Sequence, residues 1–457
     1  MILTCRTAVI AVAMSALLPV CALASNVAPK PADMAATPVA VSAPEANAEI
    51  AALKAKAEAG DAAAMADLGQ RYVDGDGVDA DDETGFGWLK KAVDAGSVPA
   101  LTQLGDLYLA GSGVDEDDDM AMKLYQQAAD KGDSMGQYSV GWMYEQGYSV
   151  KKDDVEAMKW YQLAAAQGNH FAYNHMGDVY FEGRGVAKDF ARAADYFQKS
   201  ADLGDAYGYS SLGGLYEDGE GVAKDEAKAL ALYRKSADLN GCNGLYAMGR
   251  VNEDGSLGLS ANTDKAFSYY TAAANKHCGY GYLAVGRFYS DGIGREKDDG
   301  EAFKYYALAA MKGEVLGQLR LGMSYFYGDF LPTNTHEALI WFHKAADQDS
   351  ARAQYYIGYC YMKGKDVTAD YAEALKWFKT SVEQQDAWSQ YQLGVMYENA
   401  MGVPQDRVTA LMWYSLAADQ DDDDSIAAVA AIKKQMSSGD INKAQKMAKD
   451  AKAAQGS

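Results

Sequence analysis

The chain has 457 residues, of which 49% are apolar, and its 64 acidic and 42 basic residues give a net charge of −22. Because a chain this acidic is repelled by phosphate backbones, nucleic acid is excluded as a partner. Beyond the N-terminus no stretch approaches the roughly 18 apolar residues that a membrane-spanning helix requires. The composition therefore predicts a soluble mature protein without a membrane span.

The first 24 residues have the pattern of a secretory signal peptide. An early cation, Arg6, precedes the apolar stretch 8–18, and Ala22-Leu23-Ala24 supplies small residues before Ser25. A lipid anchor at Cys21 is disfavoured, since Val20 stands where a small residue is required. We therefore expect cleavage after Ala24 and a periplasmic or secreted, extracellular location.

Residues 25–47 are rich in Ala and Pro and show no hydrophobic periodicity, which predicts a flexible linker. From residue 48 to 59 the apolar positions Ile50, Leu53 and Ala57 indicate a half-repeat cap. At the other end, residues 421–457 are expected to form a C-terminal cap of two helices, 425–436 and 440–452, with their lysines facing water. Such polar ends are what a stacked repeat array requires.

Between these ends, over residues 48–420, glycine recurs with a fixed period. The spacing is 36 residues, except for one step of 37. A fixed period in this range is typical of stacked supersecondary units that complete one another's cores. We call the ten positions the repeat glycines: Gly69, Gly105, Gly141, Gly177, Gly213, Gly249, Gly286, Gly322, Gly358 and Gly394.

Each repeat glycine belongs to a longer pattern. Tyr follows three residues later in nine of ten repeats, Asn252 being the exception, and a second glycine follows after six residues in nine of ten, with Ala400 as the exception. The second glycine ends a helix and turns the chain. An Asp then supplies the N-cap of the next helix; examples are Asp117, Asp153, Asp189 and Asp225.

The segment after each turn reads as an amphipathic helix. In the third repeat Ala157, Trp160, Tyr161, Ala164 and Ala165 follow the i, i+3, i+4, i+7, i+8 spacing. The aromatic stripe is therefore interpreted as core rather than as a cofactor site, and no cofactor is expected.

A glycine within a helix costs roughly 0.5–1 kcal/mol relative to Ala. We expect close approach of the paired helix to offset this cost, with a small residue five positions earlier widening the contact. Each repeat is thus predicted to be an antiparallel helical hairpin. Ten hairpins with end caps would stack into an all-α, α/α solenoid with a right-handed superhelix.

The combined motif resembles the Sel-one-like repeat, a relative of the tetratricopeptide repeat. The resemblance rests on small-x-x-x-(Leu/Met/Val/Ile)-Gly-x-x-Tyr-x-x-Gly-x-Gly-Val-x-x-Asp, followed by Ala-x-x-(Trp/Tyr/Leu)-(Tyr/Phe)-x-x-(Ala/Ser)-Ala-x-x-Gly, and it covers about 59–420. It implies a protein-binding adaptor in envelope assembly or at a host surface, where one relative captures secretory immunoglobulin. Certain cysteine-rich members have been linked to penicillin binding and weak β-lactam hydrolysis.

By analogy with tetratricopeptide repeats, residues three before, one after and four after each repeat glycine face the concave side. Aromatic and arginine side chains at such positions are typical of interface hot spots, although some of the tyrosines could instead pack against the next hairpin. The acids Glu145, Asp178, Glu217 and Glu253 interrupt the series. The candidate binding residues are Tyr138, Trp142, Phe181, Tyr246, Arg250, Arg287, Phe326, Tyr355, Tyr359 and Tyr391.

The sixth repeat is irregular. It contains the extra residue, Asn252 in place of Tyr, and the unusual turn 254–259. We expect this irregularity to divide the solenoid into two arcs, with Tyr246, Arg250 and Arg287 at the bend.

After processing, three cysteines remain. Cys242 and Cys278 start first helices of neighbouring repeats, and a disulfide between them would form if the stacked helices come within the bond's reach. Cys360 falls inside a first helix and is interpreted as an inert core residue.

The sequence offers little for catalysis or metal binding. Its five histidines have no convincing ligand spacing, so no metal site is predicted. Ser149-Val150-Lys151-Lys152 matches the Ser-x-x-Lys element of serine β-lactamases, but Ser-Asp-Asn and Lys-Thr-Gly are missing and Ser149 occupies a turn. The leading hypothesis is a monomeric, non-enzymatic scaffold that binds a protein or an extended peptide. The alternative is a weak enzyme acting on β-lactams or peptidoglycan.

Overall fold

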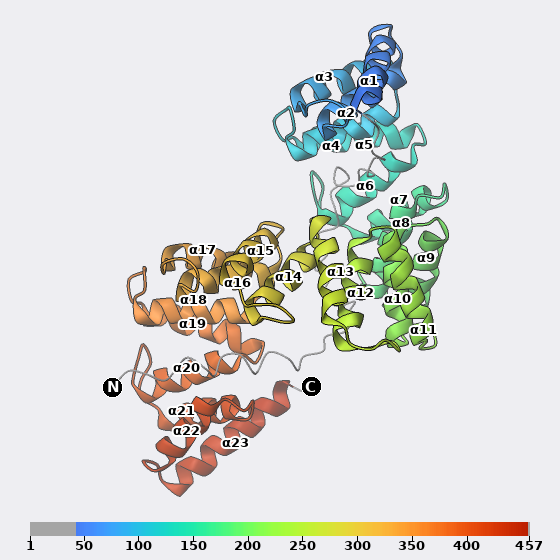
Figure 1. The fold of residues 1–457 in the computed structure, drawn as a ribbon. Coiled ribbons are helices and arrows are strands. Elements are labelled where there is room, and N and C mark those ends of the chain that lie inside the picture. The colour runs from blue at the N-terminus through green and yellow to red at the C-terminus, as the bar shows by residue number, and fades with distance from the viewer. Residues whose placement is uncertain (1–42, 456–457) are drawn as a thin grey trace. The chain divides into compact units, whose positions relative to one another are not determined.

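The computed structural model describes residues 43–455, and within this range the regular elements are all α-helices (Figure 1). Apart from three helices at the ends, they pair into ten antiparallel hairpins, which confirms the predicted α/α solenoid. The first helices are α2 (Ala62–Asp74), α4 (Pro99–Ala110), α6 (Ser134–Gln146), α8 (His170–Glu182), α10 (Ala206–Asp218), α12 (Cys242–Asp254), α14 (Gly279–Asp291), α16 (Val315–Tyr327), α18 (Ala351–Lys363) and α20 (Ala387–Glu398). The second helices are α3 (Asp82–Asp94), α5 (Asp118–Asp130), α7 (Asp154–Ala165), α9 (Phe190–Asp202), α11 (Glu226–Asp238), α13 (Thr263–Asn275), α15 (Asp299–Met311), α17 (Thr335–Ala346), α19 (Tyr371–Glu383) and α21 (Arg407–Ala418).

The hairpin array is capped by α1 (Ala43–Glu58) at one end and by α22 (Asp423–Lys433) and α23 (Ser438–Gln455) at the other. Helix α1 begins five residues before the predicted boundary at Ala48, since Pro44 in its first turn removes no helical hydrogen bond. The predicted signal peptide and residues 25–42 of the predicted linker lie outside the described residues. None of the described helices is long and apolar enough to cross a membrane.

The chain forms two compact units, and the division falls inside α12 of the sixth repeat. Unit 1 extends to Met248 and includes 255–260, whereas unit 2 consists of 249–254 and the residues from Ala261 onward. The irregular features of the sequence lie in this same repeat, where we expected the solenoid to divide into two arcs.

The helix ends follow the predicted capping chemistry. Asp117 and Asp189 are N-caps whose carboxylates accept hydrogen bonds from backbone amides of the first helical turn. Gly111 and Gly183 end first helices in the left-handed conformation, which glycine adopts without steric cost. The tenth repeat lacks this glycine, and there Ala400 takes the positive φ of 56°.

The repeat glycines contact the second helix of their own hairpin, as predicted, but mostly through a ring rather than through its backbone. A Cβ atom on Gly177 would lie 2.5 Å from Cε1 of Phe197, and one on Gly358 would lie 2.8 Å from Cε1 of Phe378. The same holds for the other repeats except the first, where Leu89 takes the place of the ring. Because the repeat glycine has no Cβ, it leaves the space that a core side chain of the second helix fills.

The small residues five positions earlier have a different role from the predicted one. A Cβ on Gly136 would lie 2.6 Å from the Cβ of Ala128, and one on Gly208 would lie 2.7 Å from the amide nitrogen of Ala201. Both partners belong to the second helix of the preceding hairpin. These positions therefore set the contact between repeats, not the contact within a hairpin.

Candidate binding surface

Three of the ten candidate residues are buried, so their assignment to a binding surface is corrected. Tyr138 is 0% exposed, Trp142 is 1% exposed and Phe326 is 7% exposed. Their rings pack in hydrophobic cores inside the repeats, where no partner reaches them without rearrangement. The idea that some of these aromatics pack against a neighbouring hairpin applies to Tyr138, whose ring contacts Phe171 of the next repeat at 5.6 Å.

Tyr138 is covered by a buried polar network in unit 1. His175 Nε2 lies 3.0 Å from the Tyr138 hydroxyl, and His175 Nδ1 lies 2.9 Å from Oε2 of Glu145. The other oxygen of Glu145 accepts a hydrogen bond of 2.6 Å from Arg184, and the Tyr161 hydroxyl also donates to this carboxylate. The network joins α6, α7 and α8 and the turn after α8, so it holds two neighbouring repeats together.

The charges of this network are stabilised by one another. Burial alone would raise the pKa of Glu145, but His175 and Arg184 lower it overall, so the carboxylate stays ionised. Burial acts to lower the pKa of His175, and Glu145 outweighs it and raises that pKa. Because each buried charge has an opposite charge in contact, the network is interpreted as structural.

Two other carboxyl groups of unit 1 form no ion pair among the described residues. Asp106 accepts a hydrogen bond of 2.7 Å from the Tyr125 hydroxyl, and Asp178 accepts one of 2.9 Å from the Tyr207 hydroxyl. Burial raises the pKa of each to about 7; the Tyr125 hydrogen bond acts to lower that of Asp106, and His175 and then the Tyr207 hydrogen bond act to lower that of Asp178. These groups are therefore partly protonated near neutral pH.

Four further candidates, Phe181, Tyr246, Arg250 and Arg287, are half-buried. The ring of Phe181 contacts Phe190 at 5.2 Å. Tyr246 and Arg250 lie on α12. Arg287 donates a 2.6 Å hydrogen bond to Glu253 within unit 2. The proposed meeting of Tyr246, Arg250 and Arg287 at a bend stays a prediction.

In unit 2 the structure brings two candidates, Tyr355 and Tyr359 of α18, into one aromatic cluster. Their ring centroids are 6.0 Å apart, and the Tyr355 ring lies 5.3 Å from that of Trp388 on α20. From α16, the Tyr327 hydroxyl lies 3.1 Å from the hydroxyl of the buried Tyr356. We call Tyr327, Tyr355, Tyr359 and Trp388 the aromatic platform.

The platform is open to solvent. Tyr327 is 49% exposed, and Tyr355, Tyr359 and Trp388 are half-buried. Burial raises the pKa of Tyr355 and of Tyr359, so both hydroxyls remain protonated donors. Three consecutive repeats thus present rings at one surface. Tyr391, the remaining candidate, packs instead on Tyr414 of its own hairpin, with ring centroids 5.5 Å apart.

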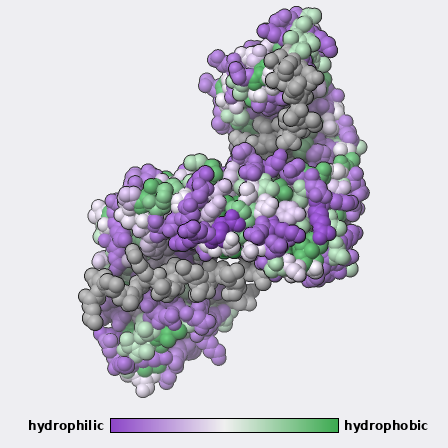
Figure 2. All heavy atoms as spheres, in the orientation of Figure 1, coloured by the Kyte–Doolittle hydropathy of each residue, from purple (hydrophilic) through white to green (hydrophobic). Residues whose placement is uncertain are grey.

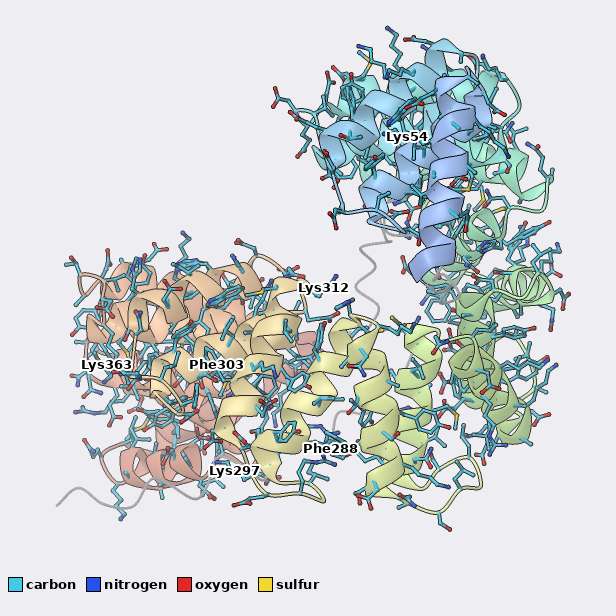
Figure 3. All side chains as sticks on the ribbon, turned by 45° about the horizontal axis from the view of Figure 1, so that its top comes forward. Lys54, Phe288, Lys297, Phe303, Lys312 and Lys363 are labelled. Atoms are coloured by element: carbon cyan, nitrogen blue, oxygen red, sulfur yellow. The ribbon has the colours of Figure 1, made fainter. Side chains whose placement is uncertain are left out.

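Cations surround the platform. The Arg352 guanidinium lies 3.4 Å above the Trp388 ring and pairs with Asp386 at 3.1 Å. The Lys365 ammonium lies 4.4 Å from the buried Phe326 ring, and that of Lys363, labelled in Figure 3, lies 5.7 Å from the Tyr359 ring. Among the described residues neither lysine forms an ion pair. Both ammonium groups therefore remain available to an acceptor on a partner.

Sequence reasoning missed Tyr327 and Trp388. Tyr327 stands five residues after its repeat glycine, where other repeats carry mostly acidic or polar residues such as Asp74, Gln146 and Glu182. An aromatic residue at a position that is usually polar could therefore have identified Tyr327 from the sequence. Trp388 gave a weaker signal, because the equivalent position also holds Phe171 and other large residues.

The remaining candidates have local roles. Ser149 lies in the turn after α6 with φ of 59°, and its hydroxyl donates to Asp119 rather than to a lysine. This is not the serine–lysine pair that the β-lactamase motif requires. Cys360 is fully buried in the core of unit 2, where burial raises its thiol pKa to about 12. The pairing of Cys242 with Cys278 stays a prediction.

The fold and the platform together define an α/α repeat protein with an open aromatic surface on its first helices. The model of the Sel1 repeat family matches ten segments of the sequence, and the chain therefore belongs to this family, whose members bind other proteins. The matched segments are 62–97, 98–133, 134–169, 170–205, 206–241, 243–278, 279–314, 315–350, 351–386 and 389–422.

Two solved structures illustrate the likeness. A protective antigen of uropathogenic Escherichia coli with an SLR fold is 28% identical, with 88% of this chain and 94% of that chain covered and a TM-score of 0.42. A Sel1 repeat protein from Oxalobacter formigenes is 32% identical, with 51% of this chain and 99% of that chain covered and a TM-score of 0.46. None of the curated proteins matches the sequence.

Proposed function

We propose that the protein is a non-enzymatic binding scaffold that holds an extended segment of another protein on the aromatic platform of unit 2. The observation that carries the proposal is the exposure of the Tyr327 ring beside the half-buried rings of Tyr355, Tyr359 and Trp388. A folded hairpin gains nothing from exposing such a ring to water. A partner that covers it gains apolar burial at small entropic cost.

The geometry suits an extended segment. The rings come from α16, α18 and α20, so they follow the direction in which the repeats stack. Aromatic rings provide apolar contact, while the tyrosine hydroxyls and the ammonium groups of Lys363 and Lys365 provide hydrogen bonds to backbone or acidic groups. Hydrophilic residues dominate the face drawn in Figure 2, with hydrophobic ones in small groups, so a local platform is the expected form of a binding site.

The cellular role is proposed from the N-terminal sequence. Residues 1–24 direct export, and the scaffold works in envelope assembly or at a host surface, with secretory immunoglobulin as one example of a host partner. Fusion of residues 1–24 to alkaline phosphatase without its own signal tests the export step. Periplasmic phosphatase activity supports it, and purely cytoplasmic enzyme contradicts it.

Site-specific crosslinking tests the binding surface. Replacing Tyr327 with p-benzoylphenylalanine in the full chain is expected to trap the partner on illumination of living cells. Tyr371, at the start of the second helix α19 and 40% exposed, is the matched control position. The proposal fails if Tyr327 gives no discrete adduct or if Tyr371 gives the same one.

A trapped partner then allows an affinity measurement. Because central aromatic contacts contribute about 2 kcal/mol or more, Tyr327→Ala is expected to weaken binding by about 30-fold. Tyr371→Ala should leave affinity unchanged. Circular dichroism of both variants verifies that the exposed substitutions preserve the fold.

A further inference from the structure

The C-terminal cap contains a second feature that the platform does not explain. Helices α22 and α23 both pack on α21 (Figure 1). Residues of these three helices and of the turn after α21 line a partly open hollow of about 360 Å³. The ammonium-bearing side chains of Lys433, Lys449 and Lys452 line it. Three lysines at one hollow stand out in a chain whose net charge is −22.

The fold compensates only part of this positive charge. Lys452 pairs with Asp419, which also lines the hollow. Lys433 and Lys449 form no ion pair among the described side chains. The three lysines and one aspartate among the lining residues carry a formal net charge of +2. An excess of positive charge around one hollow attracts an anion.

The other lining groups define the ligand further. Gln445 offers an amide, whereas Val429 and Ala448 give the hollow an apolar part. Lysines bind as point charges and do not select planar carboxylates as an arginine fork does, so charge density decides which anion binds. The volume suits a small molecule rather than a folded partner.

We propose that this hollow is a binding site for a small, multiply charged anion of the organic phosphate or tricarboxylate class. The same chemistry is found in a soluble metabolite and in a phosphate headgroup of a lipid. The site is separate from the aromatic platform and does not depend on the proposed scaffold function.

Isothermal titration calorimetry of the full chain with inorganic pyrophosphate and with citrate tests the site at low ionic strength. The Lys433→Gln/Lys449→Gln variant is expected to weaken binding of both anions by about tenfold or more, since each lost ammonium removes a charge-assisted contact. Added salt should weaken binding further. Acetate, with a single charge, should bind more weakly than either anion.

The matched control is Lys434→Gln/Lys446→Gln. It removes the same charge from the end of α22 and from α23, but neither lysine lines the hollow. We expect this control to weaken binding by less than about twofold. Equal weakening in both variants, or no detectable binding of pyrophosphate and citrate, would overturn the proposal. All four substituted lysines are at least partly exposed, so both variants should fold.

Flotation with phosphatidylcholine vesicles that contain phosphatidic acid separates the two sources of ligand. Flotation that is lost in Lys433→Gln/Lys449→Gln and kept in the control assigns a lipid headgroup. Binding of the free anions without flotation assigns a soluble ligand. Flotation that both variants retain, without anion binding, rejects the site.

Discussion

Substitution of a repeat glycine tests how the hairpins are packed. In Gly177→Ala the new Cβ would lie 2.5, 2.7 and 2.9 Å from three ring carbons of Phe197. Ordinary contact begins near 3.4 Å, so the ring must move by about 0.9 Å. Phe197 is 2% exposed and packs among buried residues of α9, α10 and α11, which leaves it little room.

The magnitude follows from two opposing contributions. Alanine stabilises a helix by about 1 kcal/mol relative to glycine, whereas overpacking a core costs about 1–3 kcal/mol. Gly87 of α3 is the matched control, because a Cβ there would meet no atom within 4 Å. Both variants gain the helical contribution, so Gly177→Ala should be about 1–3 kcal/mol less stable than Gly87→Ala.

Urea unfolding followed by circular dichroism measures the difference, since both sites lie in unit 1. Adding Phe197→Leu to Gly177→Ala should restore about 1 kcal/mol, because the smaller side chain leaves space for the new methyl group. The reasoning is refuted if Gly177→Ala is as stable as Gly87→Ala.

Three further predictions concern buried charges and the serine motif. Burial raises the pKa of Asp178 from 3.8 to about 7. Between these pH values the folded chain holds a proton that the unfolded chain has released, so unit 1 should lose stability as the pH rises from about 4 to about 7. Asp178 accounts for at most about 4 kcal/mol of this loss in the free energy of unfolding. In urea titrations at several pH values, Asp178→Asn should make stability depend less on pH. A pH dependence equal to that of the unsubstituted protein would contradict the raised pKa of Asp178. Arg184→Met should lower the free energy of unfolding by about 3 kcal/mol, because the carboxylate of Glu145, 4% exposed, stays buried with less compensating positive charge. Arg71→Met, whose carboxylate partners are about half exposed, should lower it by less than about 1 kcal/mol. Equal losses in urea unfolding would reject the network. Purified protein should give no nitrocefin turnover, and turnover that Ser149→Ala abolishes would establish the enzymatic alternative.

The repeat architecture could be predicted from the sequence because its signals are local. The glycine period, the Asp at each N-cap and the left-handed glycine at each first-helix end depend on residues within one hairpin. The irregular sixth repeat also marked where the chain divides into two units. The contact partner of the repeat glycine was less predictable, since the ring of Phe197 lies 20 residues from Gly177.

The binding surface was only partly predictable, because exposure depends on neighbouring repeats. Tyr138 and Tyr355 occupy the same position in their repeats, yet the first is 0% exposed and the second is half-buried. The hydroxyl of Tyr138 contacts His175 of the next repeat, whereas the equivalent position after Tyr355 is Gln392. The periodic pattern gives both tyrosines the same environment and cannot distinguish them.

The sequence by itself determined the hairpin, its caps, its period and the set of first-helix positions from which a binding surface is drawn. Only the tertiary structure decided which of these side chains remain open: the rings of Tyr355 and Tyr359 join Tyr327 and Trp388 at the surface, whereas those of Tyr138 and Trp142 are enclosed. The physical reason is that helix formation and capping depend on residues close in sequence, while burial depends on side chains about one period away.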